Sequence, residues 1–248
     1  MKKKTEKPGA GDGQKTFEAN LNAYSVNYGS MLDLGRMQRL GFPEVVYAGE
    51  KPEKDLLEII GAILDKGLPA FVSAVDQGME KFIREHFQGI RMEKGGRLMV
   101  IGEVEPPERQ MGRAALITAG TSDIPYAEEC FLLLKSLGVR AEMVHDVGVA
   151  GIHRAFAAFE HVGDADVLVV FAGMEGMLPI LMASLSDRPV IGVPTPVGYG
   201  MGGKGVGALS SMLQSCVPGL MVVNIGNSVG AAAGAVRILN AQRRDSGG

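Results

Sequence analysis

The chain has 248 residues, a formal net charge of −3 and 46% apolar residues. This length allows one large domain or two modest ones with a sizeable buried core. The slightly acidic balance argues against a protein that coats nucleic acid or an anionic membrane, so neither partner is expected. The two cysteines, Cys130 and Cys216, are too few for a disulfide framework or a thiolate metal cage.

The sequence predicts neither a membrane-spanning helix nor a secretory signal. No apolar run approaches the ~20 residues of a membrane-spanning helix. The basic segment Met1–Lys4 is not followed by an apolar core, so it is not a secretory signal. We therefore expect a cytoplasmic enzyme. The 35 glycines crowd into the second half, which indicates loops shaped around a ligand.

The first half of the chain predicts a polar tail over residues 1–28 and a small α+β domain over residues 29–108. Helical spacing and strand-like runs alternate in this domain, and Lys94-Gly95-Gly96 marks a hairpin. The expected helices span residues 31–38, 52–66 and 79–87, and the expected strands span 44–47, 69–74, 91–92 and 98–104. Glu105-Pro106-Pro107-Glu108 is the predicted linker.

Residues 109–248 predict a different architecture, because short apolar runs alternate strictly with helical segments. The expected strands span residues 114–119, 139–144, 167–172, 190–193 and 220–225. The expected helices span 125–137, 150–160, 178–185, 206–215 and 231–240. Such alternation predicts an α/β fold, a parallel sheet covered by helices on both faces. Ligands of these sheets bind beyond the carboxyl ends of the strands.

The first strand is followed by a polar loop, Ala119-Gly120-Thr121-Ser122-Asp123, and a proline in the next turn. Gly120, Thr121 and Ser122 at a helix N-terminus are suited to hold a phosphate or carboxylate. Asp123 is placed to face a metal or a substrate proton. The alternative is that Ser122 or Asp123 only caps the helix.

The next two loops also place polar groups at strand ends. The second contains His153 and Arg154 next to glycines, and Arg154 is suited to a bidentate contact with phosphate or carboxylate. The third contains Gly173 and Glu175. We interpret Gly173 as a substrate contact and Glu175 as a magnesium ligand or a proton-transfer group. The alternative for Glu175 is a carboxylate that stabilises a helix start.

The stretch from Val190 to Asn227 combines a strand, a long glycine loop, a helix and a second strand. Glycine loops bring main-chain N–H groups close to a ligand, so we expect Gly198, Tyr199, Gly200 and Asn227 to contact substrate. Cys216 lies between a helix end and a Pro-Gly turn, and we expect it to face the same rim as a nucleophile.

A free cysteine is most often a small buried hydrophobe, and that is the interpretation of Cys130. Cys216 follows a helix C-terminus, which is the wrong end of the dipole to stabilise a thiolate. A reactive thiol there needs a cation, which Lys204, Arg154 or a cationic substrate would provide.

Several of these segments resemble the aminoimidazole ribonucleotide carboxylase family. The matching pieces are Ile152-His153-Arg154, residues 172–179, residues 189–194 and Ile225-Gly226-Asn227. The sequence is most similar to the LarB branch of that family, which acts in nickel-pincer cofactor biosynthesis. The branch is marked by A-G-T-S-D-I-P, D-V-G-V-A-G-I-H-R, G-M-E-G, V-G-Y-G and S-C-x-P-G, and the similarity extends over about residues 32–239.

The resemblance implies a carboxylase-like three-layer fold and a reaction. LarB-like enzymes add a carboxylate from CO₂ or bicarbonate to the pyridinium ring of nicotinic acid adenine dinucleotide and cleave its phosphoanhydride. Cys216 would add to the ring, and Glu175 would serve Mg²⁺ or a proton transfer. Ser122 and Asp123 would hold the mononucleotide end. A homo-oligomer is implied as well, with an octamer among the orders considered.

Two departures from the branch keep alternatives open. The pattern N-I-D-N-G-F-G has Gly226 in place of its aspartate and Val229 in place of its aromatic residue. A purine-pathway carboxylase or mutase is the second hypothesis, and a nucleotide-binding protein without catalysis is the third. A dehydrogenase is disfavoured because no G-x-G-x-x-G follows the first strand.

Overall fold

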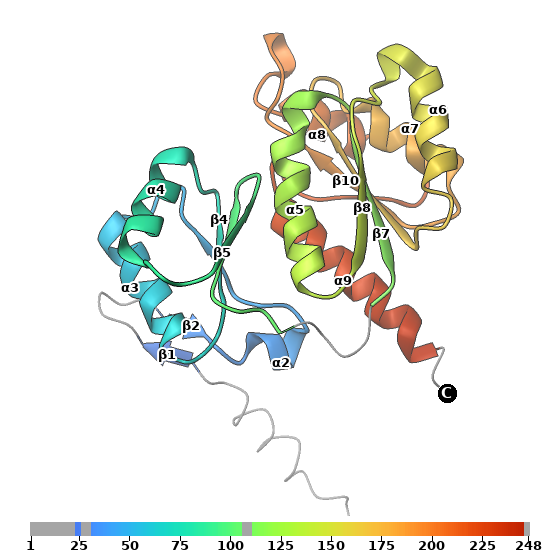
Figure 1. Cartoon of the computed structure of the whole chain (residues 1–248). Coiled ribbons are helices and arrows are strands. Elements are labelled where there is room, and N and C mark those ends of the chain that lie inside the picture. Colours follow the sequence, from blue (N-terminus) through green and yellow to red (C-terminus); the bar gives the residue numbers. More distant parts are fainter. Residues whose placement is uncertain (1–22, 26–30, 106–110, 246–248) are drawn as a thin grey trace, which may run out of the picture.

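The computed structural model describes residues 23–25, 31–105 and 111–245. We call residues 31–105 the N-terminal unit and residues 111–245 the C-terminal unit. The N-terminal unit contains a four-stranded mixed sheet, and the C-terminal unit contains a five-stranded parallel sheet (Figure 1). The predicted α/β class, with a small α+β part before it, is therefore confirmed.

The N-terminal sheet has the strand order β3 (Val45–Tyr47), β4 (Ala70–Ser73), β6 (Leu98–Ile101), β5 (Met92–Gly95). β3 and β4 are parallel, and the remaining pairs are antiparallel. Helices α3 (Glu53–Leu64) and α4 (Gln77–His86) pack on one face through an apolar cluster. The sequence predicted these helices and strands to within a few residues, because each has a clear apolar period.

The predicted helix over residues 31–38 is wrong in its first part. Met31–Asp33 forms strand β2, which pairs antiparallel with β1 (Ala23–Ser25), and helix α2 begins only at Arg36 (Arg36–Leu40). Strand β1 also falls within the predicted tail. This pairing depends on a polar segment with no strand-like period of its own. The rest of the tail, and residues 106–108 of the predicted linker, lie outside the described residues.

The C-terminal sheet has the strand order β11 (Leu220–Val222), β10 (Val190–Pro194), β9 (Val167–Ala172), β7 (Arg113–Thr118), β8 (Arg140–Val144). All pairs are parallel. The six residues of β9 are all buried, as expected for a central strand covered on both faces. The chain starts in the middle at β7, moves to one edge, and then returns to the other side through β9, β10 and β11.

Helices cover both faces of this sheet. One face carries α5 (Ile124–Ser136) and α9 (Ser228–Asp245), and the other carries α6 (Ile152–His161), α7 (Met177–Leu185) and α8 (Val206–Leu213). In Figure 1, α5 lies on the side of the sheet that faces the N-terminal unit, and α6 and α7 lie on the opposite side. None of the helices in the described ranges has the length and apolar character needed to cross a membrane.

The two units share one hydrophobic core through α5. Phe71 and Leu98 of the N-terminal sheet belong to the same buried cluster as Leu132 of α5. The hairpin turn between β5 and β6 lies directly on this helix. A Cβ at Gly96 would lie 2.0 Å from the Pro125 carbonyl oxygen, so only glycine permits this approach. The N-terminal unit is thus packed against the helix that follows the first candidate-site loop.

Candidate active site

The loops at the carboxyl ends of the five parallel strands form the candidate site. From β7 the chain first adds β8 on one side and then β9 on the other, so the order of the strands reverses between β7 and β9. Ligands of open parallel sheets bind at such a switch point. All predicted site residues except Cys216 lie on these loops or in the helical turns that follow them: Gly120, Thr121, Ser122, Asp123, His153, Arg154, Gly173, Glu175, Gly198, Tyr199, Gly200 and Asn227. This part of the sequence-based prediction depended only on strand direction.

Asp123 connects three of the loops. Its side chain is 3% exposed and accepts hydrogen bonds from the Thr195 hydroxyl (2.5 Å) and the Gly120 N–H (2.9 Å). The Gly173 N–H also donates to it. Burial raises the pKa of the Asp123 carboxyl above its ordinary value, and these three hydrogen bonds oppose the rise. Asp123 therefore fixes the loops at the switch point, whereas Thr121 and Ser122 beside it are exposed.

Gly173 is buried because two loops meet at its Cα. A Cβ there would lie 2.2 Å from the Val197 carbonyl oxygen and 2.9 Å from Thr195 Oγ1. The close approach of the β9 and β10 loops explains this glycine without a ligand. Its N–H donates a hydrogen bond to the Asp123 carboxylate, so Gly173 helps to position that side chain.

Arg154, in the first turn of α6, binds the loop that precedes this helix. Its Nη1 donates to the carbonyl oxygen of Asp146 (2.6 Å) and to the Asp146 carboxylate (2.7 Å). His153 beside it is exposed, and no contact of its ring joins it to Arg154 among those described. A phosphate would have to compete with Asp146 for the guanidinium, so the predicted anion contact of Arg154 stays a prediction.

Glu175 follows Met174, which has a positive φ of 49°, and its side chain is exposed at the carboxyl edge. Within residues 31–105 and 111–242, no group of three His, Cys, Asp or Glu side chains could hold a metal ion. A magnesium site formed by protein ligands alone does not fit this part of the chain. Glu175 as a magnesium ligand remains a prediction, and no step proposed below depends on bound magnesium.

The β10 loop contains Tyr199, a predicted site residue with a largely exposed side chain. Tyr199 is 82% exposed, and its neighbours Gly198 and Gly200 are exposed as well, with φ of 149° and 72°. These residues are open to a ligand or to another protein surface. Their predicted role in substrate binding is compatible with this exposure.

Cys216 does not lie on the predicted rim. It precedes β11, whose first residue, Leu220, pairs with the first residue of β10, Val190. Cys216 therefore lies at the amino ends of the strands, on the edge opposite Asp123. The interpretation failed because α8 runs antiparallel to the strands and returns the chain to the far edge before the cysteine. Lys204 and the α6 residue Arg154 lie at the carboxyl edge and cannot assist this thiol within one chain.

The cysteine side chains themselves agree with the remaining expectations. Cys216 is an exposed free thiol and is not buried in apolar surroundings. Cys130 is fully buried in the core between α5 and the sheet, as predicted, and burial raises the pKa of its thiol. Only Cys216 is accessible to a substrate.

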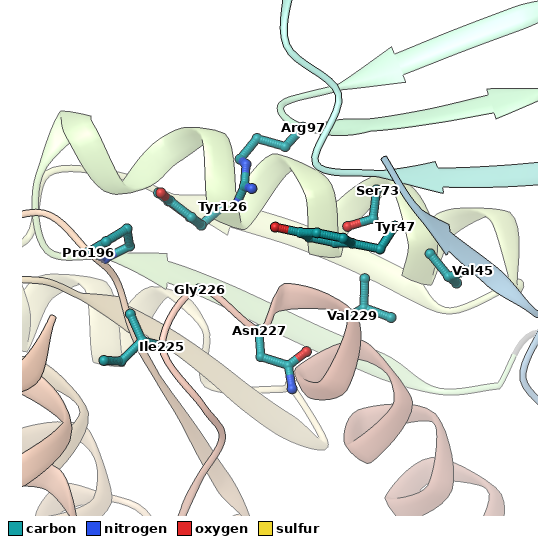
Figure 2. A pocket seen from close by; sticks show the side chains of 10 residues that line it. All are labelled: Val45, Tyr47, Ser73, Arg97, Tyr126, Pro196, Ile225, Gly226, Asn227 and Val229. Carbon is teal, nitrogen blue, oxygen red and sulfur yellow. The ribbon is translucent and has the colours of Figure 1, made fainter. Parts of the chain in front are cut away.

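A cavity of about 450 Å³ adjoins the carboxyl edge, and the sequence analysis missed most of its walls. Figure 2 shows these residues, which come from both units: Val45, Tyr47, Ser73, Arg97, Tyr126, Pro196, Ile225, Gly226, Asn227 and Val229. Asn227 is the one predicted site residue among them. Its Oδ1 also accepts the Gly230 N–H (2.7 Å) and so caps α9.

Behind this cavity lies a buried carboxylate that joins the two units. Glu129 of α5 is 1% exposed and accepts a hydrogen bond from the Ser73 hydroxyl (2.6 Å). Arg97 Nη1 lies 3.9 Å from its second oxygen. Burial raises the pKa of the Glu129 carboxyl, against the opposing effects of Ser73, Arg97 and the Ala74 N–H. An acidic residue on the apolar stripe of a predicted helix was the available sequence signal.

Glu129 should make stability depend on pH. A raised pKa means that the folded chain favours the protonated carboxyl, so this contribution is complete below the ordinary pKa of 4.5 and is lost as pH rises through the folded value. Urea unfolding of wild type and Glu129→Gln at about pH 5 and about pH 8 measures the effect. We expect the glutamine variant to gain stability relative to wild type at the higher pH. Asp123 is present in both wild type and Glu129→Gln, so its contribution to the pH dependence of stability cancels in the comparison. A difference that is constant with pH would contradict this account.

The strand order, the helices on both faces and the glycine-rich loops at the carboxyl edge define the C-terminal unit as an open parallel α/β fold with a ligand site at its strand ends. Comparisons with known proteins agree with this class. A family model described as AIR carboxylase matches residues 113–246, and one described as LarB/PurE-like N-terminal domain matches residues 26–103.

The relatives differ in how much of this chain they match. An uncharacterized protein of Methanocaldococcus jannaschii is 39% identical over 223 residues, which is 86% of each chain. N5-carboxyaminoimidazole ribonucleotide mutases of M. jannaschii and Aquifex aeolicus are 36% and 34% identical. They cover 45% and 50% of this chain and 67% and 75% of their own lengths. The chain belongs to the AIR carboxylase family of carboxylases and mutases, in the form that has a LarB/PurE-like N-terminal domain.

Proposed function

We propose that the protein carboxylates the pyridinium ring of nicotinic acid adenine dinucleotide and hydrolyses the phosphoanhydride. The products are pyridinium-3,5-biscarboxylic acid mononucleotide and AMP. The observation that supports this proposal most directly is the exposed thiol of Cys216 within an S-C-x-P-G turn, in a chain that also has the LarB/PurE-like N-terminal unit. An accessible free thiol is what addition to an electron-poor ring requires.

The second candidate is the mutase reaction of purine biosynthesis, which the identity to N5-carboxyaminoimidazole ribonucleotide mutases favours. Those matches cover about half of this chain or less. They leave the N-terminal unit unexplained, although it shares its core with α5 and forms one wall of the cavity. The dinucleotide is larger than a mononucleotide, so its second half could contact the wall that the N-terminal unit forms.

The proposed carboxylation passes through a covalent adduct between Cys216 and the pyridinium ring. The Cys216 thiolate adds to the pyridinium ring, a C–S bond forms, and the ring nitrogen accepts the electron pair. The ring is then an enamine, and its nucleophilic carbon forms a C–C bond to CO₂. A base removes the proton from that carbon, and the thiolate leaves to restore the aromatic ring. Glu175 is the exposed carboxylate at the carboxyl edge that would accept this proton. Water cleaves the phosphoanhydride separately.

Because Cys216 and Asp123 lie on opposite edges of one sheet, the proposed site needs a second copy of the chain. We propose that the Cys216 turn of one copy meets the carboxyl edge of its neighbour in a homo-oligomer. Exposed apolar side chains on the carboxyl edge and on α6–α8 support such an interface. They are Ile152, Phe156, Met174, Met177, Tyr199, Met201, Val206 and Leu213.

Incubation of pure protein with the dinucleotide, ¹³C-bicarbonate and Mg²⁺ tests the reaction. We expect AMP and a labelled dicarboxylated mononucleotide by mass spectrometry. Cys216→Ala should form no detectable product, because the ring then has no nucleophile. Ser210→Ala, an exposed position on the preceding helix, is the matched control and should keep full turnover.

Two outcomes would overturn the proposal. One is undiminished product from Cys216→Ala. The other is no product from the dinucleotide together with conversion of N5-carboxyaminoimidazole ribonucleotide, which would establish the mutase reaction instead.

A further inference from the structure

The cavity between the two units has a mixed lining suited to a flat, charged ligand. Its volume of about 450 Å³ lies in the ~300–1,000 Å³ range of small-molecule sites. The rings of Tyr47 and Tyr126 form one wall, and Ile225, Asn227 and Val229 lie across from them (Figure 2). Tyr126 is in the first turn of α5, three residues after Asp123, so the cavity is continuous with the carboxyl-edge loops.

Arg97 is the only charged residue among the described residues that line this cavity. Its guanidinium lies over the Tyr126 ring, 4.9 Å from the centroid, and Figure 2 shows it between Tyr126 and Tyr47. The nearest carboxylate oxygen, on Glu129, is 3.9 Å away, which is too long for a hydrogen bond. Glu129 is already bound to Ser73 and lies behind the wall. The guanidinium thus has donor capacity for an anion in the cavity.

Gly226 determines whether that charge stays available. A Cβ at Gly226 would lie 3.3 Å from Tyr126 Cε1 and 3.9 Å from Arg97 Nη1. A carboxylate on that Cβ would reach the guanidinium and neutralise it. This chain has glycine there, in the left-handed region (φ 66°). With glycine at this position, Arg97 faces the cavity without a paired acid on that side.

We propose that this cavity binds the adenosine monophosphate half of the dinucleotide, with the base against the two tyrosines and the phosphate at Arg97. The inference rests on the proposed function for the identity of the whole substrate. Aromatic side chains and a nearby guanidinium suit a purine base joined to a phosphate. The pyridinium half is cationic and is disfavoured beside Arg97, so it occupies the loops around Asp123 instead.

Calorimetric titration of AMP into the full chain tests this assignment by binding alone. Arg97→Met should weaken AMP binding by about tenfold to a hundredfold, the effect of one charge-assisted hydrogen bond or pair. Gly226→Asp should weaken it by a similar factor. Gly226→Asn has the same shape without the charge, and both residues tolerate the left-handed backbone, so it should stay within about threefold of wild type. Adenosine without its phosphate should respond little to Arg97→Met.

Three results would overturn the assignment: no AMP binding to wild type, equal affinity in Gly226→Asp and Gly226→Asn, or inorganic phosphate matching AMP in affinity. If Arg97→Met does not fold, the Gly226 pair still decides. Failure here is separable from failure of the proposed reaction. Turnover of the dinucleotide with Arg97-independent AMP binding rejects the cavity only. Arg97-dependent AMP binding without turnover rejects the reaction only.

Discussion

Two inactive variants, Cys216→Ala and Asp123→Asn, should restore activity to each other when they are mixed within one oligomer. Each site is proposed to take its thiol from one copy and its acidic loop from the next, because the two residues lie on opposite edges of the sheet. In a random equal mixture, about a quarter of such head-to-tail sites would combine both intact groups. Co-expression with two tags, tandem purification and the ¹³C-bicarbonate assay measure the recovery.

Mixtures of each variant with itself are the control and should stay inactive. A mixture that forms hetero-oligomers yet shows no activity above these controls would mean that the site lies within one chain. The Cys216 turn would then have to move from the amino edge of the sheet to the carboxyl edge. The amount of hetero-oligomer is checked by native mass spectrometry, so an assembly failure is not mistaken for a negative result.

Asp123→Ala should be the most destabilising substitution among the candidate site residues. It removes the buried acceptor shared by Thr195, Gly120 and Gly173. Buried donors left without a partner cost about 1–3 kcal/mol each, so we expect a loss of about 3 kcal/mol or more in the free energy of unfolding. Urea denaturation measures it. Activity should be lost at temperatures where the variant is still folded, because the loops at the switch point are no longer held together.

Asp187→Ala is the matched control for this experiment. Its side chain is 99% exposed, and its ion pair with Arg188 is long at 3.9 Å, so the change should stay within about 0.5 kcal/mol. A loss at Asp123 no larger than this would show that the three hydrogen bonds contribute little to loop geometry.

The sequence was sufficient for the parallel sheet and for the edge at which most candidate residues gather. Both follow from local patterns: apolar runs give the strands, the alternation gives their direction, and direction fixes where Asp123 and Glu175 lie. Strand β2 was mistaken for a helix because its partner, Ala23–Ser25, lies in a polar segment whose sequence has no strand-like apolar period. Pairing between segments is not encoded in the period of either one.

The candidate site was harder to predict wherever it depends on contacts between residues that are distant in the sequence. Arg97 lies in a hairpin turn and Tyr126 on a helix of the other unit, and no spacing in the sequence relates them. Thr195 follows a strand directly, yet its partner Asp123 is 72 residues away. Cys216 was placed on the wrong edge because its short turn was assumed to return to the rim, whereas α8 ends at the opposite one.

The packing of the β5–β6 hairpin on α5 has a consequence for any attempt to study the catalytic half by itself. A chain beginning at Met111 would present Leu132 and its apolar neighbours to water, and Glu129 would lose both Ser73 and Arg97. Such a fragment would tend to associate through that bare helix face. Its poor behaviour would then reflect a missing piece of its interior and would say nothing about the chemistry at the strand ends.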